Sequence, residues 1–187
     1  MIPINRIKEL ESDSKTRKNV RKAAVVALFY PDENLKTKLL LILRKTYKGV
    51  HSNQIGFPGG KVEDEDFDLK ATALRETWEE VGVASEYISL VKTLTSVYIP
   101  PSNFEVQPYI GICNRELQFT IQEEEVASLV EVFVTDLMND ENRNTQKMNT
   151  SYATEIDVPI FKLNGYTVWG ATAMMLNEIK DLLKQLL

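Results

Sequence analysis

The sequence predicts a single mixed α/β or α+β domain, and three observations support this fold class. The chain has 187 residues, a length that suits one large domain better than two. Strand-like apolar runs stand before, between and after helical patterns. Hydrophobic residues make up 43% and charged residues 26% of the chain, ordinary values for a globular protein. We therefore expect residues 1–187 to form one domain, with residues 1–22 as an N-terminal helical extension.

The extension is polar, but Ile4, Ile7 and Leu10 recur at helical spacing and predict a short helix that packs on the body of the domain. Residues 23–30 and 38–43 then predict two strands, because both runs are apolar and a turn rich in proline, aspartate and asparagine separates them. The first part of the domain should therefore be a helix followed by two strands.

A longer helix is predicted from about Asp68 to Val81. Gly82 should end it, because glycine tolerates the left-handed conformation that closes many helices. Residues 87–98 and 104–113 are typical of strands, and the turn-forming sequence IPPSN joins them.

The last third of the chain has weaker signals. Residues 123–129 suit a short helix or turn, and residues 130–134 a strand. Residues 139–154 are polar and predict the most mobile loop. An amphipathic helix should begin at about Val168 and continue to the end of the chain.

The overall charge and the cysteine count exclude some classes of protein. The formal net charge is −5, so the chain lacks the dense basic surface that binding nucleic acid requires. Cys113 is the only cysteine, so no internal disulfide can form and a cytoplasmic location is expected. No apolar run approaches the length that spans a bilayer, so no membrane partner is expected.

The sequence TALRETWEEVG, at residues 72–82, carries the strongest chemical signal. On a helical wheel one stripe is apolar and consists of Ala71, Leu74, Trp78 and Val81. The opposite side carries three carboxylates, those of Glu76, Glu79 and Glu80. Arg75 lies four residues before Glu79, at the spacing of an ion pair. One face of the helix should anchor in the core while the carboxylates project together.

Two interpretations of these carboxylates remain open on spacing alone. Charge runs usually form a solvated helix face. However, Glu76 and Glu80 repel each other at this spacing, and acidic residues near a helix C-terminus oppose its dipole. A bound divalent cation would reverse both penalties. The glycines Gly59 and Gly60 just upstream would allow close approach of the backbone, and a carbonyl there could be a further metal ligand.

This pattern closely resembles the Nudix box, GX5EX7REUXEEXGU, in which U is aliphatic. The matching residues are Gly60, Arg75, Glu76, Glu79, Glu80, Gly82 and Val83, so the box covers about residues 60–83. The gap before Arg75 is one residue longer than usual, Asp66 stands near the place of the first glutamate, and Thr77 replaces the aliphatic residue. The resemblance implies a Nudix fold, with a mixed β-sheet sandwiched between helices.

The longer gap is shared by the Nudix branch that resembles coenzyme A pyrophosphatases. Similar segments are LLILR at 40–44, HSNQIGFPGGK at 51–61, FEVQPYIG at 104–111 and WGATAMML at 169–176. The branch's signature upstream of FPGG is only partly present, because Gly49 stands at its arginine position and Asn53 at its glycine position.

The resemblance implies a hydrolase that uses Mg²⁺ or Mn²⁺ to cleave a pyrophosphate bond. The implied metal ligands are Glu76, Glu79, Glu80 and the carbonyl of Gly60 or its neighbour Gly59. Arg75 would hold a glutamate in place. Glu125 is the candidate for a further acid from a late loop, with Glu123 and Glu124 as substitutes; the alternative, that all three are solvated surface acids, is left open by the sequence. The expected substrate-binding residues are Arg44, Phe57, Gly59, Gly60 and Lys61.

Other chemically active side chains have simpler explanations. His51 lies close to FPGG, but we expect a structural or incidental loop residue. Cys113 should belong to the core and not act as a nucleophile. Trp169, Met174 and Met175 are expected to pack in the core. The strand aromatics Tyr98, Phe104 and Tyr109 could stack on an adenine, although such residues usually pack.

Three functions remain to be compared. The first is hydrolysis of coenzyme A or its derivatives to 4′-phosphopantetheine and adenosine 3′,5′-bisphosphate. The second is hydrolysis of another nucleoside diphosphate compound, such as ADP-ribose or a dinucleotide. The third is a non-catalytic binding module, which the complete set of box glutamates argues against. A homodimer is compatible with all three.

Overall fold

The computed structural model describes residues 19–45, 54–148 and 155–186. The helix expected near Ile4 lies outside these residues, as do His51 and the signature positions Gly49 and Asn53. The expected extension to residue 22 is wrong at its end, because Arg21 already begins the first strand.

A mixed sheet of eight strands forms the centre of the domain. Its strands are β1 (Arg21–Pro31), β2 (Thr37–Arg44), β3 (Ile55–Gly56), β4 (Gly59–Lys61), β5 (Ser89–Thr93), β6 (Val97–Ile99), β7 (Phe104–Ile112) and β8 (Val126–Phe133). The order is β3-β2-β1-β7-β5, while β4 pairs with β1, β6 with β7 and β8 with β2. Only the pairing of β1 with β7 is parallel among these described strands. The short strand β4 therefore lies directly beside β1.

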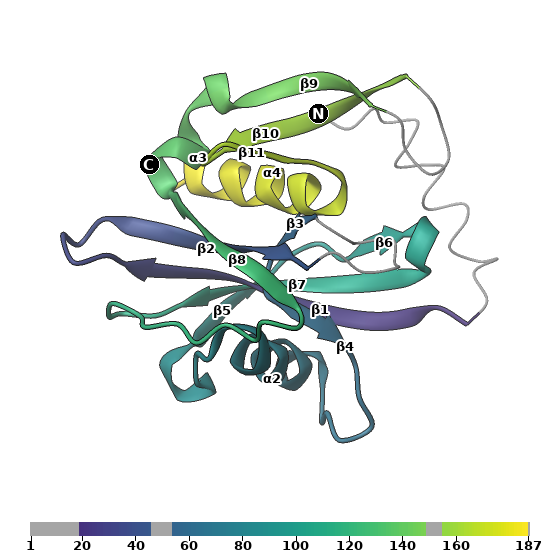
Figure 1. Cartoon of the computed structure of the whole chain (residues 1–187), viewed down its shortest axis with the longest axis vertical. Coiled ribbons are helices and arrows are strands. Elements are labelled where there is room, and N and C mark those ends of the chain that lie inside the picture. The colour runs from purple at the N-terminus through teal and green to yellow at the C-terminus, as the bar shows by residue number, and fades with distance from the viewer. Residues whose placement is uncertain (1–18, 46–53, 149–154, 187) are drawn as a thin grey trace.

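Helices α2 (Leu69–Val81) and α4 (Gly170–Lys184) cover opposite faces of this sheet (Figure 1). Strand β1 shows why, because its side chains alternate between two apolar clusters. Ala24 and Val26 join the cluster beneath α2, and Ala23 and Val25 join the cluster beneath α4. The predicted sandwich of a mixed sheet between helices is confirmed. No helix of the described residues is both long and apolar enough to span a membrane.

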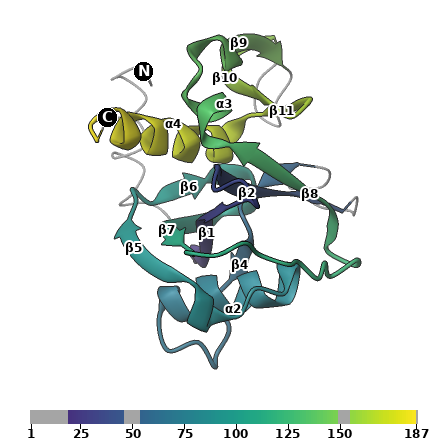
Figure 2. The ribbon, with the colours of Figure 1, turned by 90° about the vertical axis from the view of Figure 1, so that its left-hand side faces the viewer.

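A second, antiparallel sheet lies beyond α4, on the side away from the main sheet (Figure 2). It consists of β9 (Arg143–Met148), β10 (Ile156–Leu163) and β11 (Tyr166–Val168). Phe161 and Leu163 of β10 share a core cluster with Leu176 and Ile179 of α4. The short helix α3 (Val134–Met138) leads from β8 toward this sheet.

Three sequence-based expectations about strands are wrong. Residues 123–125 form a turn, as expected, but the strand expected at 130–134 begins earlier, because β8 starts at Val126 and runs unbroken beside β2. The expected loop at 139–154 contains β9, which pairs with β10 in an antiparallel ladder; its polar sequence has no apolar pattern that would have indicated a strand. The single strand expected at 87–98 is divided between β5 and β6.

Candidate active site

Local signals define both ends of helix α2, as the sequence predicts. The Asp68 side chain caps the first turn, accepting a hydrogen bond of 2.8 Å from the Ala71 N–H. Gly82 adopts a left-handed conformation with φ of 73°, and its N–H donates to the Trp78 carbonyl at 2.8 Å. The helix carrying the carboxylates is therefore held at both ends by its own sequence.

The buried face of α2 differs from the predicted stripe. Trp78, expected in the core, is 54% exposed, whereas Glu80, expected on the solvent side, is 1% exposed. The buried face consists of Thr72, Ala73, Thr77, Glu80 and Val81. Its small residues allow the helix to lie close to the sheet, and the buried Thr77 hydroxyl donates to the Ala73 carbonyl at 2.7 Å. An apolar pattern alone could not reveal this, because Glu80 is buried through polar partners.

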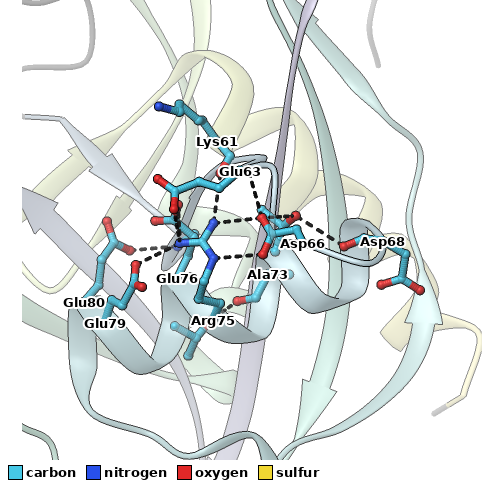
Figure 3. Close-up of polar contacts among 12 residues, drawn as sticks. Lys61, Glu63, Asp66, Asp68, Ala73, Arg75, Glu76, Glu79 and Glu80 are labelled. Carbon is cyan, nitrogen blue, oxygen red and sulfur yellow. Dashed lines mark hydrogen bonds and ion pairs between the residues drawn. The ribbon is translucent and has the colours of Figure 1, made fainter.

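Arg75 connects the end of β4, the loop that follows it and the acidic face of α2 (Figure 3). Its guanidinium donates to both carboxylate oxygens of Asp66, at 2.8 and 2.9 Å. It also pairs with Glu79 at 2.9 Å and Glu76 at 3.2 Å, and donates to the Lys61 carbonyl at 3.1 Å. The expected ion pair between Arg75 and Glu79 is confirmed.

Asp66 is the partner of Arg75 that sequence reasoning did not identify. Its side chain is 3% exposed and also accepts hydrogen bonds from the Thr72 hydroxyl and the Glu63 N–H, both at 2.9 Å. The hydrogen bonds from Arg75 hold the pKa of Asp66 well below its usual range. The position of Asp66 near the expected first glutamate of the box was the available signal.

The Glu80 carboxylate lies between α2 and the sheet, and each of its oxygens has a partner. One oxygen pairs with Arg44 at 3.1 Å, and the other accepts the Gly59 N–H at 2.7 Å. Burial raises the pKa of Glu80 to about 7, although Arg44 and the Gly59 N–H oppose this shift. Arg44, expected to bind substrate, therefore contacts a carboxylate of the box in this structure.

Gly59 and Gly60, together called the glycine turn, lie so close to their neighbours that no Cβ atom would fit at either position. A Cβ atom at Gly60 would collide with the Glu76 carboxylate, and one at Gly59 with the backbone of Ala24 and Val25. Gly59 also has a φ of 140°, a conformation that residues with a side chain rarely adopt. Glycine at both positions thus allows the backbone of β4 to fit between β1 and α2.

Hydrogen bonds connect the turn that contains Glu125 to helix α2 and to the end of β2. The Gln122 N–H donates to the Glu80 carbonyl at 3.0 Å. Lys45, at the end of β2, donates its N–H to the Glu125 carbonyl at 2.8 Å and its ammonium to the Glu123 carbonyl at 2.5 Å. Burial raises the pKa of Glu76, Arg75 opposes this, and the negative charges of Glu79 and Glu125 add to the rise. Glu125 also raises the pKa of Glu80, so its charge reaches two glutamates of α2.

These groups fit a hard divalent cation by their chemistry. Carboxylate and backbone carbonyl oxygens are the ligands that Mg²⁺ and Mn²⁺ accept. Glu76, Glu79, Glu80, Glu125 and the carbonyl of Gly60 could supply them. No three acidic, histidine or cysteine side chains among the described residues already surround one point. In this arrangement arginine and backbone N–H groups engage the oxygens, so a cation would have to compete with them.

The remaining predicted site residues lie in different surroundings. Phe57 is 2% exposed and packs in the core cluster beneath α4, so its expected contact with substrate is not supported. Lys61 is exposed. Cys113, Tyr109 and Met175 are buried, in agreement with the structural roles expected for them.

The sequence model of the NUDIX domain family matches residues 20–148. The chain is 31% identical over 168 residues to the Nudix hydrolase NudL of Enterobacter sp. strain 638, covering 86% of this chain and 82% of the relative. It is 29% identical over 155 residues to the peroxisomal coenzyme A diphosphatase ndx-8 of Caenorhabditis elegans, covering 82% of this chain and 64% of that protein. These matches confirm the predicted resemblance to the coenzyme A pyrophosphatase-like branch.

Solved structures share the fold. An Ap4A hydrolase of C. elegans in a binary complex superposes with a TM-score of 0.59 at 17% identity, covering 89% of this chain and 99% of that one. The NUDIX domain of Shewanella oneidensis NrtR in complex with ADP ribose has a TM-score of 0.54 at 18% identity, covering 95% and 97%. The family match and the relatives agree with the box geometry described above, and the chain therefore belongs to the NUDIX domain family and is a Nudix hydrolase.

Proposed function

We propose that this Nudix pyrophosphohydrolase cleaves the pyrophosphate bond of coenzyme A or its derivatives. Water adds to one phosphorus atom, and the bridging oxygen leaves with the other. The products are 4′-phosphopantetheine, or its acyl form, and adenosine 3′,5′-bisphosphate. The C. elegans relative named a coenzyme A diphosphatase and the branch-like segments around FPGG support this choice of substrate.

One observation carries the catalytic part of the proposal: backbone hydrogen bonds hold the turn that contains Glu125 against α2, because the Gln122 N–H donates to the Glu80 carbonyl at 3.0 Å. Glu76 and Glu80 lie on α2, while Glu125 precedes β8, and the charge of Glu125 disfavours ionisation of both. Arg75 and Arg44 offset part of this repulsion, and a divalent cation would offset more of it. Sites with strongly perturbed carboxylates in a polar cluster are candidates for function.

The cofactor in this proposal is Mg²⁺ or Mn²⁺, held by Glu76, Glu79, Glu80 and the carbonyl of Gly60 or its neighbour Gly59, with Glu125 as a further acid. When bound, such a cation lowers the pKa of a water ligand and neutralises charge on the phosphates. Gly60 has no side chain, and a Cβ atom there would collide with the Glu76 carboxylate; this close approach of backbone and carboxylate supports the choice of a glycine carbonyl as a further ligand.

The chain's own residues orient these groups. Arg75 holds Glu79 in place, and Asp66 in turn holds Arg75, so the acidic face is fixed before substrate arrives. Lys61 is exposed at the end of β4 and is available to the negative phosphates. Substrate binding is assigned to Lys61 and to the glycine turn, and no longer to the buried Phe57.

The test is the mass of the products after incubation with coenzyme A and Mg²⁺ or Mn²⁺. Glu79→Gln is the informative variant, because Glu79 is 51% exposed and its loss should leave the fold intact. The matched control is Glu86→Gln, a surface glutamate in the 3-10 turn Ser85–Tyr87 after α2. We expect a large loss of turnover in the first variant only. Equal turnover in both variants would refute the site assignment.

A second substrate class is supported by the departures from the branch signature at Gly49 and Asn53. If the missing arginine contacts an anionic group of coenzyme A, this chain acts instead on ADP-ribose or a dinucleotide. The same assay decides between them, because turnover of ADP-ribose without turnover of coenzyme A would reject the first substrate and keep the hydrolase chemistry.

A further inference from the structure

Arg44 reaches the site because of its place on β2. Side chains alternate along a strand, and Leu40 and Ile42 both lie in the core cluster beneath α2. Arg44 is the next residue on that face, at the end of the strand where the apolar cluster gives way to the carboxylates. The position of Arg44 on β2 therefore places its guanidinium beside α2, where its side chain is 24% exposed.

The guanidinium contacts two oxygens at once. One nitrogen pairs with the Glu80 carboxylate at 3.1 Å, and the other donates to the Gly59 carbonyl at 2.6 Å. Because the Gly59 N–H donates to the second oxygen of Glu80 at 2.7 Å, the three residues form a closed ring that joins β2, β4 and α2. Such charge-assisted hydrogen bonds are the strong ones in proteins, and a planar fork suits two acceptors.

Both oxygens are also of the kind that a divalent cation takes. A carboxylate and a backbone carbonyl are hard ligands, and Glu80 and the glycine turn are parts of the proposed cation site. An ionised carboxylate that is 1% exposed needs a positive partner, either a bound cation or a basic side chain, because a buried unpaired charge is strongly unfavourable. In the present arrangement Arg44 is that partner.

We propose that Arg44 is a positioning residue that competes with the divalent cation for the Glu80 carboxylate and the Gly59 carbonyl. It neutralises Glu80 and holds the Gly59 carbonyl beside it, so that the ligands stay in position. The cation then competes with Arg44 for these oxygens, and its arrival frees the guanidinium at the edge of the site. This inference rests on the proposed function, since it takes Glu80 and the glycine turn as the cation site.

The test compares Arg44→Met with Lys61→Met, which removes the same charge from an exposed lysine of β4. Melting temperature is measured without metal and with saturating Mn²⁺, and Mn²⁺ affinity is measured at pH 8 by the electron paramagnetic resonance signal of the free ion. Arg44→Met should lower the metal-free melting temperature and bind Mn²⁺ about threefold more tightly or better, because a competitor is gone. Its Mn²⁺-dependent rise in melting temperature should exceed that of the parent.

Three results would overturn the inference. The first is an unchanged metal-free melting temperature in Arg44→Met, the second is equal or weaker Mn²⁺ binding, and the third is the same gain in affinity in Lys61→Met. If Arg44→Met does not fold, Arg44→Lys carries the test, because one ammonium cannot hold both oxygens in the fork geometry and the same two changes should appear in smaller size. If the parent protein binds no Mn²⁺ at all, the proposed cation site itself fails, an outcome distinct from a reversed order of affinities.

Discussion

Removal of the Asp66 carboxylate should destabilise the protein and misplace Arg75. Asp66 accepts hydrogen bonds from two Arg75 nitrogens, the Thr72 hydroxyl and the Glu63 N–H, and its side chain is 3% exposed. In this variant Arg75 retains its ion pair with Glu79. Its side chain is 23% exposed, so hydration of the guanidinium offsets part of the free energy lost with Asp66. We therefore expect Asp66→Ala to cost about 2–3 kcal/mol, below the full penalty of breaking a wholly buried pair.

For a chain of this length such a loss corresponds to a fall in melting temperature of roughly 5–10 °C. The assay is thermal and urea denaturation followed by circular dichroism, with turnover measured on the same samples. The matched control is Asp64→Ala, which removes an exposed carboxylate from the same loop. Equal stability of the two variants would refute the reasoning, because it would mean that the Asp66 contacts contribute nothing.

The pH dependence gives an independent check of this pair. Arg75 lowers the pKa of Asp66 in the folded protein, so the contribution is complete above the unfolded carboxyl pKa of about 3.9. It is lost as the pH falls from there toward the lower folded pKa. The difference in free energy of unfolding between parent and Asp66→Ala should be constant near neutral pH and shrink below about pH 4. A difference that grows on acidification would contradict the assigned direction.

Three further predictions follow from other contacts. The pKa of Glu80 rises from 4.5 to about 7 on folding, so the metal-free protein should lose stability as the pH rises through that interval, measured by urea denaturation; stability that increases there would contradict it. Gly60→Ala should lower turnover about tenfold to a hundredfold, because the added methyl group displaces the Glu76 carboxylate; a kinetic assay with unchanged kcat would exclude this. Lys180 is fully buried and pairs with the exposed Asp140 at 3.0 Å. Lys180→Met should keep the melting temperature, whereas Lys180→Ala should lower the free energy of unfolding by about 2–5 kcal/mol because it leaves a cavity. Equal losses of stability in calorimetry would be inconsistent with that account.

The local features of this protein were determined by sequence alone. Helix α2 begins at its Asp68 cap and ends at left-handed Gly82, and both signals act within one turn of the helix. The alternation along β1 and the pairing of Arg75 with Glu79 at four residues' distance are equally local. Hydrogen bonds and packing between near neighbours follow directly from residue order, so a pattern in one sequence can reveal them.

Only the tertiary structure decided which carboxylates are buried and what neutralises them. A helical wheel predicts that Glu80 faces solvent, yet Arg44 of β2, 36 residues earlier, pairs with it on the face of the sheet that α2 covers. Strand β9 has no apolar pattern and exists through its pairing with β10, and Phe57 is enclosed by the core instead of facing substrate. Burial and charge pairing depend on which distant segments meet, and the energy of a charge depends on the water removed around it. That information arises only when the sheet and both helices have assembled.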